Sequence, residues 1–278
     1  MQQSTDFDIT PDQESIATVD RDIRFFPTSN DQPSSLSAAC IDTWNREGYL
    51  GPLDLYDERS IIEIRGYFDK LLEETLASGQ DSYSISSAHL KHGRVWDILN
   101  HPLLVSYVGN LLGEDVIGWG SHFFCKMPMD GKRVDWHQDC SYWPLTPSKA
   151  VTVWLAIDDA DQENGCMEVY TGSHLHGLID FEASTSGSGN VLNQSVKNPQ
   201  QYGNHQLTPL VAGQISIHSD LLVHGSSPNH SNRRRCGLTL RYCPASVTAY
   251  LGWNRKGVVV KGRASSESWP GAKRPDSD

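Results

Sequence analysis

Three side chains have the types and the spacing of a site for a single metal ion. His137 and Asp139 form a His-x-Asp triplet, and His224 follows in a later segment, Leu-Leu-Val-His-Gly-Ser. Two imidazoles and one carboxylate can occupy one face of an iron(II) ion and leave positions open for a substrate and dioxygen. Residues i and i+2 of an extended segment point to the same side, so His137 and Asp139 can reach one ion while Gln138 points elsewhere.

A second triplet, His218-Ser219-Asp220, limits what the first can prove. The chain contains 11 histidines among 278 residues, and chance alone could supply both triplets. Gln214–Ile217 has the pattern of a strand and Ser219-Asp220 that of the turn ending it, so we interpret Asp220 as a turn residue. His218 is then a packed or solvent-facing strand residue, because most histidines are structural.

The segments that must position these residues change character along the chain. After Asp57, apolar residues recur at intervals of three and four up to Leu76, which predicts a helix with one buried face. A second helical pair is predicted on either side of Pro102, with Gly113 as its end. Short β-rich runs follow at Val116–Lys126, Val151–Ile157, Met167–Tyr170, Gln214–Ile217 and Leu238–Tyr242. This order predicts a mainly β or α+β domain, a sandwich or barrel with helices packed outside.

Composition divides the chain into one body and two polar ends. Residues 1–35 are rich in Ser, Asp, Gln, Thr and Pro, and residues 264–278 form a second polar segment. We expect a flexible N-terminal arm over 1–35, a single domain over 36–263 and a flexible C-terminal tail over 264–278.

Charge and cysteine content narrow the class of partner and the compartment. A net charge of -11 repels phosphate backbones and anionic lipid, so nucleic acid and membrane surfaces are poor partners and a small molecule is expected. The six cysteines are scattered without a CxxC pair, which is typical of reduced residues in a cytoplasmic protein. No signal peptide or transmembrane span is expected from the sequence.

Several motifs of the β-rich region, taken together and in order, resemble the phytanoyl-CoA dioxygenase family. They are Trp136–Pro144, Trp154–Ile157, Glu163–Met167, Gly172–His174, and His224–Ser226 with Arg235 after it. The resemblance covers roughly residues 37–245. It implies a mainly β fold with flanking helices, a double-stranded β-helix (a cupin-like jelly roll), with iron(II) and 2-oxoglutarate held in the mouth of the barrel.

The resemblance implies specific ligands. Iron is bound in that family by the two residues of the triplet and a distal histidine, which corresponds here to His137, Asp139 and His224. An arginine eleven positions after the distal histidine binds the distal carboxylate of 2-oxoglutarate, which corresponds to Arg235, and a planar guanidinium suits that contact. Arg235 ends the run Arg233-Arg234-Arg235, so its register stays open, and the other interpretation is three solvated loop arginines.

Four further positions are candidates for contact with the cosubstrate. Trp154 matches a tryptophan beside 2-oxoglutarate in the family, Ser226 the serine two positions after the distal histidine, and His122 a position where members vary. Trp154 could instead fill the core, the commoner role of a tryptophan in an apolar strand. Gln138 either contacts bound ligand or lies at the surface.

Residues beside the triplet bear on the substrate. Tyr142 and Trp143 either line its pocket or serve as packing aromatics. Lys126, Lys132 and Arg133 lie close to the triplet in the sequence, and no long apolar segment marks an acyl tunnel, which together favour a small polar metabolite.

The preferred interpretation is an iron(II)- and 2-oxoglutarate-dependent dioxygenase that hydroxylates a small molecule and releases succinate and CO2. Asp139 argues against a halogenase, because halogenating relatives replace that carboxylate with Ala or Gly. One alternative is a non-catalytic jelly-roll module that binds metal or ligand. Another alternative is a zinc hydrolase with the same triad. The absence of an HExxH motif weakens this interpretation, and a hydrolase has no evident need for Arg235.

Overall fold

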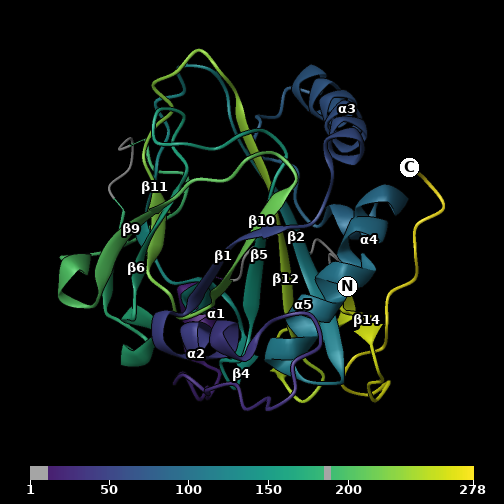
Figure 1. Cartoon of the computed structure of the whole chain (residues 1–278), viewed down its shortest axis with the longest axis vertical. Helices are drawn as coiled ribbons and strands as arrows, with labels where there is room; N and C mark the ends of the chain where they lie inside the picture. The colour runs from purple at the N-terminus through teal and green to yellow at the C-terminus, as the bar shows by residue number, and fades with distance from the viewer. Residues whose placement is uncertain (1–11, 185–188) are drawn as a thin grey trace.

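Two antiparallel sheets face each other at the centre of the molecule (Figure 1). The computed structural model describes residues 12–184 and 189–278. The larger sheet has the strand order β1-β10-β5-β12-β2-β14 and the smaller one β3-β11-β6-β9, with antiparallel pairing throughout both. This arrangement confirms the prediction of a mainly β fold of jelly-roll type with flanking helices.

The strands follow the β-rich runs of the sequence closely. In sheet order, the larger sheet contains β1 (Tyr49–Asp54), β10 (Gln214–Ser219), β5 (Val151–Ala156), β12 (Arg235–Pro244), β2 (Val116–Lys126) and β14 (Val258–Lys261). The smaller sheet contains β3 (Val134–His137), β11 (His224–Ser226), β6 (Met167–Thr171) and β9 (Asn204–Thr208). Two further pairs are β4 (Leu145–Thr146) with β13 (Thr248–Ala249) and β7 (Phe181–Ala183) with β8 (Gln194–Val196).

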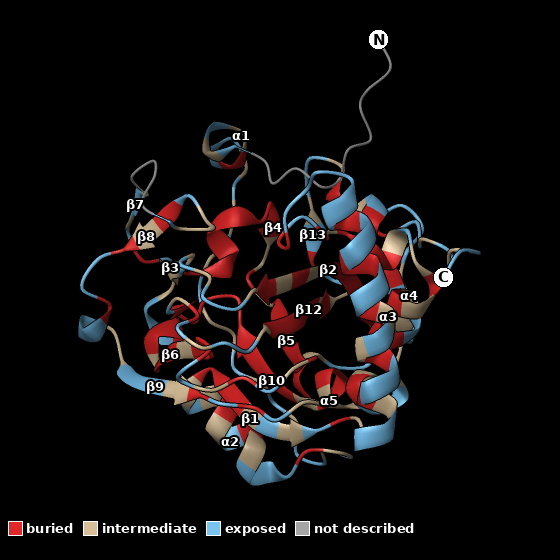
Figure 2. Cartoon of the chain, turned by 90° about the horizontal axis from the view of Figure 1, so that it is seen from above, coloured by how far each residue is buried: buried red, intermediate tan, exposed pale blue. Residues whose placement is uncertain are grey.

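The predicted helices cover the outer face of the larger sheet. They are α3 (Glu58–Ala77), α4 (Gly93–Leu99) and α5 (Pro102–Leu112), while α1 (Gln13–Ala17) and α2 (Ala38–Glu47) precede them. The Asp57 carboxylate caps α3 by accepting from the Ser60 N–H at 2.8 Å, and Pro102 occupies the first turn of α5. Figure 2 shows α3 with its exposed face outward, and Phe68 stacks on Phe123 of β2 at 4.8 Å beneath it.

Alternation along the central strands gives the larger sheet two different faces. Leu238 and Leu240 of β12 pack with Val153 and Leu155 of β5 in the core under the helices, and all four side chains are 0% exposed. The residues between them point to the smaller sheet, and on β12 these are Arg235, Gly237, Thr239 and Arg241. The face away from the helices is therefore polar and carries the candidate site.

Both polar ends of the chain pack against the body where the structure describes them. Ile16 is 2% exposed, and Arg21 donates to two carbonyl oxygens of residues 140–143. At the other end, the Trp269 side chain is also 2% exposed and its indole N–H is hydrogen-bonded. Polar composition did not predict these contacts, because one or two apolar anchors suffice to dock a polar segment. Residues 1–11 lie outside the description, and the flexibility of both ends stays a prediction.

Helices of the described ranges do not combine the length and the apolar character that crossing a bilayer requires.

Candidate metal centre

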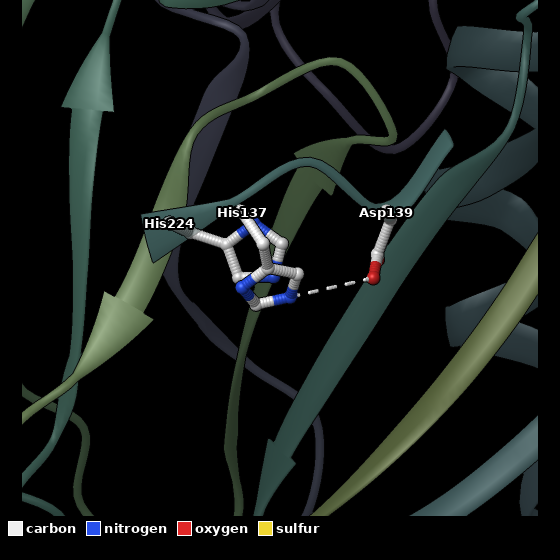
Figure 3. Close-up of side chains that lie close together, drawn as sticks. All are labelled: His137, Asp139 and His224. Carbon is white, nitrogen blue, oxygen red and sulfur yellow. Dashed lines mark ion pairs between the residues drawn. The ribbon is translucent and has the colours of Figure 1, made fainter. Parts of the chain in front are cut away.

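His137, Asp139 and His224 meet between the two sheets. His137 ends β3 and His224 begins β11, and the pairing of these strands places the two residues directly opposite each other, with ring centroids 4.1 Å apart. Asp139 opens the short 3-10 helix Asp139–Tyr142, and its Oδ1 lies 3.8 Å from Nε2 of His137 (Figure 3). One potential ligand atom from each side chain lies within 4.8 Å of the other two, so the three can share one ion.

Backbone carbonyl groups fix the proton positions of both imidazoles. Nδ1 of His137 lies 2.8 Å from the Asp135 oxygen, and Nδ1 of His224 lies 2.9 Å from the Leu222 oxygen. A carbonyl oxygen only accepts, so each Nδ1 carries the proton and each Nε2 keeps a lone pair for a metal. Burial lowers the pKa of both histidines, which keeps them neutral as metal ligands must be.

Asp139 supplies the negative charge of the group. Burial by itself would raise the pKa of this carboxyl, but the polar His218 ring 3.6 Å away and the positive charge of Arg241 outweigh burial and lower it. The Thr152 hydroxyl donates to Oδ2 at 2.6 Å, which orients the carboxylate. Two neutral imidazoles and one ionised carboxylate form a donor set that fits a divalent iron ion.

His218 borders this group, a position that the sequence did not indicate. Its side chain is 1% exposed on β10, its Nε2 lies 3.6 Å from Oδ2 of Asp139, and its ring centroid lies 4.4 Å from that of His224. Of the two alternatives left by the sequence, a packed or a solvent-facing strand residue, the structure has the packed one, but neither ring nitrogen has a hydrogen-bond partner among the described residues. Asp220 lies in the predicted turn, where Ser148 donates to it at 2.6 Å, and it is not a member of the group His137, Asp139 and His224.

A cavity of about 570 Å³ opens between the sheets around the triad. Its walls include most side chains that the sequence predicted for the cosubstrate and substrate: His122, Tyr142, Trp143, Trp154, Ser226 and Arg235. Volumes of this order are typical of small-molecule sites.

The structure resolves the register of the three arginines. Arg235 is 3% exposed and faces the cavity, where its Nε and Nη2 donate to the Gly165 oxygen at 3.0 and 2.6 Å. Arg234 points to the opposite face and pairs with Asp158, and Arg233 pairs with Asp161. Arg235 is therefore the arginine of the run that a ligand in the cavity can reach.

Trp154 and Gly237 complete this end of the cavity. The Arg235 guanidinium carbon lies 5.5 Å from the centroid of the Trp154 ring. The indole covers the neighbouring backbone so closely that a Cβ at Gly237 would lie 2.0 Å from one of its ring atoms. A side chain at position 237 would displace the indole, so glycine is needed there to seat Trp154 beside Arg235.

Comparison with known proteins identifies the family. The sequence model of the phytanoyl-CoA dioxygenase (PhyH) family matches residues 44–237. The chain belongs to the phytanoyl-CoA dioxygenase family. It is 26% identical over 190 residues to a probable alpha-ketoglutarate-dependent hypophosphite dioxygenase of Stutzerimonas stutzeri, which covers 65% of each chain. It is also 26% identical over 239 residues to the L-proline trans-4-hydroxylase of Streptomyces griseoviridis, covering 75% of this chain and 88% of that enzyme.

The match covers only part of some relatives. It spans 65% of the hypophosphite dioxygenase and 44% of the peroxisomal phytanoyl-CoA dioxygenase of Bos taurus. Among solved structures, the apo form of the non-heme monooxygenase ThoJ superposes with a TM-score of 0.73 at 24% identity, covering 85% of this chain and 88% of that one. The epimerase SnoN, in complex with Fe3+, alpha ketoglutarate and nogalamycin RO, superposes with a TM-score of 0.62 at 20% identity, covering 76% of this chain and 84% of that one. These likenesses establish the shared fold.

Gln138 has a different role in this family member from the ligand contact considered above. It is 2% exposed but does not line the cavity. Its Nε2 donates to the oxygens of Gly177 and Leu221, and its Oε1 accepts from the Ile179 N–H at 2.7 Å. These contacts contradict both readings of Gln138, as a ligand contact and as a surface residue. Gln138 therefore points away from the candidate metal group, and its amide ties three loops together.

Of the three basic residues that lie close to the triplet in the sequence, only Lys132 lines the cavity. Lys126 is fully buried behind the wall, donating to the Ser226 oxygen at 3.3 Å, and burial and the charge of Arg235 lower its pKa to about 6. Lys132 lies at the cavity edge in an ion pair with Asp81 at 2.8 Å. Arg133 pairs with Asp135 outside the lining.

Proposed function

We propose that this chain is an iron(II)- and 2-oxoglutarate-dependent dioxygenase that hydroxylates a small molecule and releases succinate and CO2. The observation that carries the proposal is the presence, in one cavity, of the buried His137, Asp139 and His224 group and of a buried arginine, Arg235, on the facing sheet. A metal site alone fits many functions, but a metal site with a separate carboxylate anchor fits a cosubstrate that bridges the two. The similarity to a probable alpha-ketoglutarate-dependent hypophosphite dioxygenase and to an L-proline trans-4-hydroxylase supports the same reaction class.

Each side chain of the site has a defined task. His137, Asp139 and His224 hold iron(II) from one side, and their fixed proton positions and ionised carboxylate need no rearrangement on binding. Bound iron(II) supplies the redox chemistry that couples oxidation of 2-oxoglutarate to oxidation of a C–H bond. Arg235 binds the carboxylate of 2-oxoglutarate that is remote from iron, and Trp154 packs beside it. The buried walls orient the substrate carbon and exclude solvent.

The test separates catalysis from binding alone. The iron(II) protein is supplied with 2-oxoglutarate and oxygen, and succinate is measured with and without a chelator, in wild type and in Asp139→Ala. Succinate that depends on iron and on Asp139 supports the dioxygenase. Stoichiometric binding of 2-oxoglutarate without succinate in the presence of candidate substrates would favour the non-catalytic module, and ester or amide hydrolysis with zinc would favour the hydrolase.

A further inference from the structure

Strand β12 brings a second arginine into the cavity. Arg235 and Arg241 are six residues apart on the same face of an uninterrupted stretch, so their backbones lie about 20 Å apart at ~3.3 Å per residue. Arg241 is paired with Thr152, whose hydroxyl donates to Asp139. Arg241 therefore lies on the strand next to Thr152, which supports the candidate metal group. It is at the end of the cavity remote from Arg235.

The Arg241 guanidinium forms no ion pair within the described parts of the chain. Its Nε is buried without a hydrogen bond, and within the described residues no carboxylate lies in ion-pair distance of its guanidinium. Asp139 is the carboxylate whose charge acts on it, and Asp139 belongs to the metal-ligand group. By contrast, Arg233 and Arg234 on the outer surface both have carboxylate partners. Arg241 is half-buried, and a partly desolvated cation without an ion-pair partner is costly, so this position suits an anion from outside the chain.

The surroundings of Arg241 define the rest of the ligand. Its guanidinium carbon lies 5.3 Å from the Trp143 ring centroid, and Trp119 packs edge-on against Trp143 at 4.7 Å and beside Trp253 at 5.4 Å. All three indoles line the cavity, as does Lys256, a buried residue that supplies a second cation beside the half-buried Arg241. This end of the cavity therefore combines positive charge with an aromatic wall.

A buried histidine fixes the segment that carries Lys256. His89 is fully buried, with Nδ1 2.8 Å from the Ser121 hydroxyl and Nε2 3.2 Å from the Lys256 oxygen. The 3-10 helix Trp253–Lys256 is thereby tied to β2, so the second cation and the Trp253 ring hold their places in the wall.

We propose that the substrate is an organic carboxylate whose charge is bound by Arg241, with Lys256 as the second cation and its apolar or aromatic body against Trp119, Trp143 and Trp253. This inference rests on the proposed function, because it assigns Arg235 to 2-oxoglutarate and leaves Arg241 for the substrate. Two anions then occupy one cavity without competing, each with its own guanidinium on one strand. Arg241 is a specificity-determining residue in this assignment.

The experiment compares acids with their neutral amides. The iron(II) protein is saturated with 2-oxoglutarate under argon, and the charge-transfer absorbance verifies that both are bound. Indole-3-acetate, phenylacetate and hexanoate, each with its amide, are then titrated while tryptophan fluorescence and calorimetry report binding. We expect at least one acid to bind 10-fold or more tighter than its amide. In Arg241→Gln that acid should bind roughly 10- to 100-fold more weakly, and Arg241→Lys should retain part of the preference.

Controls separate this inference from the proposed function. Arg255→Gln removes an exposed cation beside Lys256 and should leave acid binding unchanged. Iron stoichiometry and 2-oxoglutarate affinity should persist in Arg241→Gln. Equal affinity for acids and amides in wild type, or no saturable binding of any acid, would overturn the inference while the absorbance still upheld the function. Loss of iron or 2-oxoglutarate in Arg241→Gln would also overturn it, because Arg241 would then serve Asp139 or the cosubstrate. A missing absorbance in wild type would reject the function itself.

Discussion

Replacement of Arg235 is the most direct perturbation of the proposed cosubstrate site. The guanidinium is 3% exposed and is held by two hydrogen bonds to the Gly165 oxygen, which leaves Nη1 and one proton of Nη2 for a carboxylate. Arg235→Leu removes a charge-assisted, bidentate contact in a partly desolvated pocket. Such a loss typically amounts to ~2 to 5 kcal/mol, or roughly 30-fold to several thousand-fold in 2-oxoglutarate affinity. Arg235→Lys keeps the charge but not the planar, bidentate guanidinium, so its loss of 2-oxoglutarate affinity should be smaller than that of Arg235→Leu.

The assay is a 2-oxoglutarate titration of the anaerobic iron(II) protein, followed by its metal-to-ligand charge-transfer absorbance. Iron stoichiometry should not change in Arg235→Leu, because the three proposed metal ligands lie on other elements. Arg233→Leu and Arg234→Leu are matched controls on the adjacent positions. Arg234 pairs with Asp158 on the outer face, so its loss should lower the melting temperature but leave 2-oxoglutarate affinity within about two-fold, as expected for a group screened from the cavity.

Three outcomes would refute this reasoning. A large loss of affinity in Arg234→Leu with near wild-type affinity in Arg235→Leu would mean that the register is wrong. A large loss in Arg241→Leu alone would move the cosubstrate to the other end of the cavity. Small and equal changes in 2-oxoglutarate affinity in every arginine variant would mean that 2-oxoglutarate is not the cosubstrate, and would favour the non-catalytic binding module.

Other perturbations test neighbouring parts of the site. His224→Ala should abolish stoichiometric iron binding, measured by metal analysis, and full retention would exclude the triad. Gly237→Ala should displace the Trp154 ring, costing ~1 to 3 kcal/mol in chemical denaturation and weakening 2-oxoglutarate binding. Burial raises the pKa of Asp220 to about 7, so the folded state holds a proton that the unfolded state releases above ~3.9, and stability falls as pH rises between these values. The melting temperature of Asp220→Asn should therefore drop less from pH 5 to pH 8 than that of wild type, and equal drops would contradict this.

Local sequence patterns were sufficient for most of the fold. The period of the apolar residues after Asp57 predicted α3, and the β-rich run at 116–126 predicted β2 with its observed bounds. Helix α3 is long and keeps one buried face, and β2 is a long run that is buried along nearly all of its length, so both patterns are visible without tertiary information. Strands β3 and β11 are four and three residues long, and runs this short have no readable period, although each carries one of the two candidate metal-ligating histidines.

The parts of the site that escaped prediction depend on contacts distant in sequence. His218 lies beside Asp139 because β10 pairs with β5, and the local sequence of neither segment predicts this contact. Gln138 was correctly expected to point away from the metal, but its partners come from two other loops. The position of Arg241, by contrast, could have been predicted from the alternation of residues along its strand. Once Arg235 is assigned to the inner face, every second residue of the strand must share that face.

Strand β12 links the stability of the fold to the selectivity of the site. Leu238 and Leu240 are fully buried under the helices, while Arg235 and Arg241 face the cavity from alternate positions of the same strand. A register slip of one residue would turn both leucines into the polar cavity and bring Arg234 inward in place of Arg235. Apolar packing against the helices therefore selects which arginines reach the ligands. The spacing of the two guanidinium groups is set by the strand itself, so a substrate anion and a cosubstrate anion can be held apart by geometry that the core already enforces.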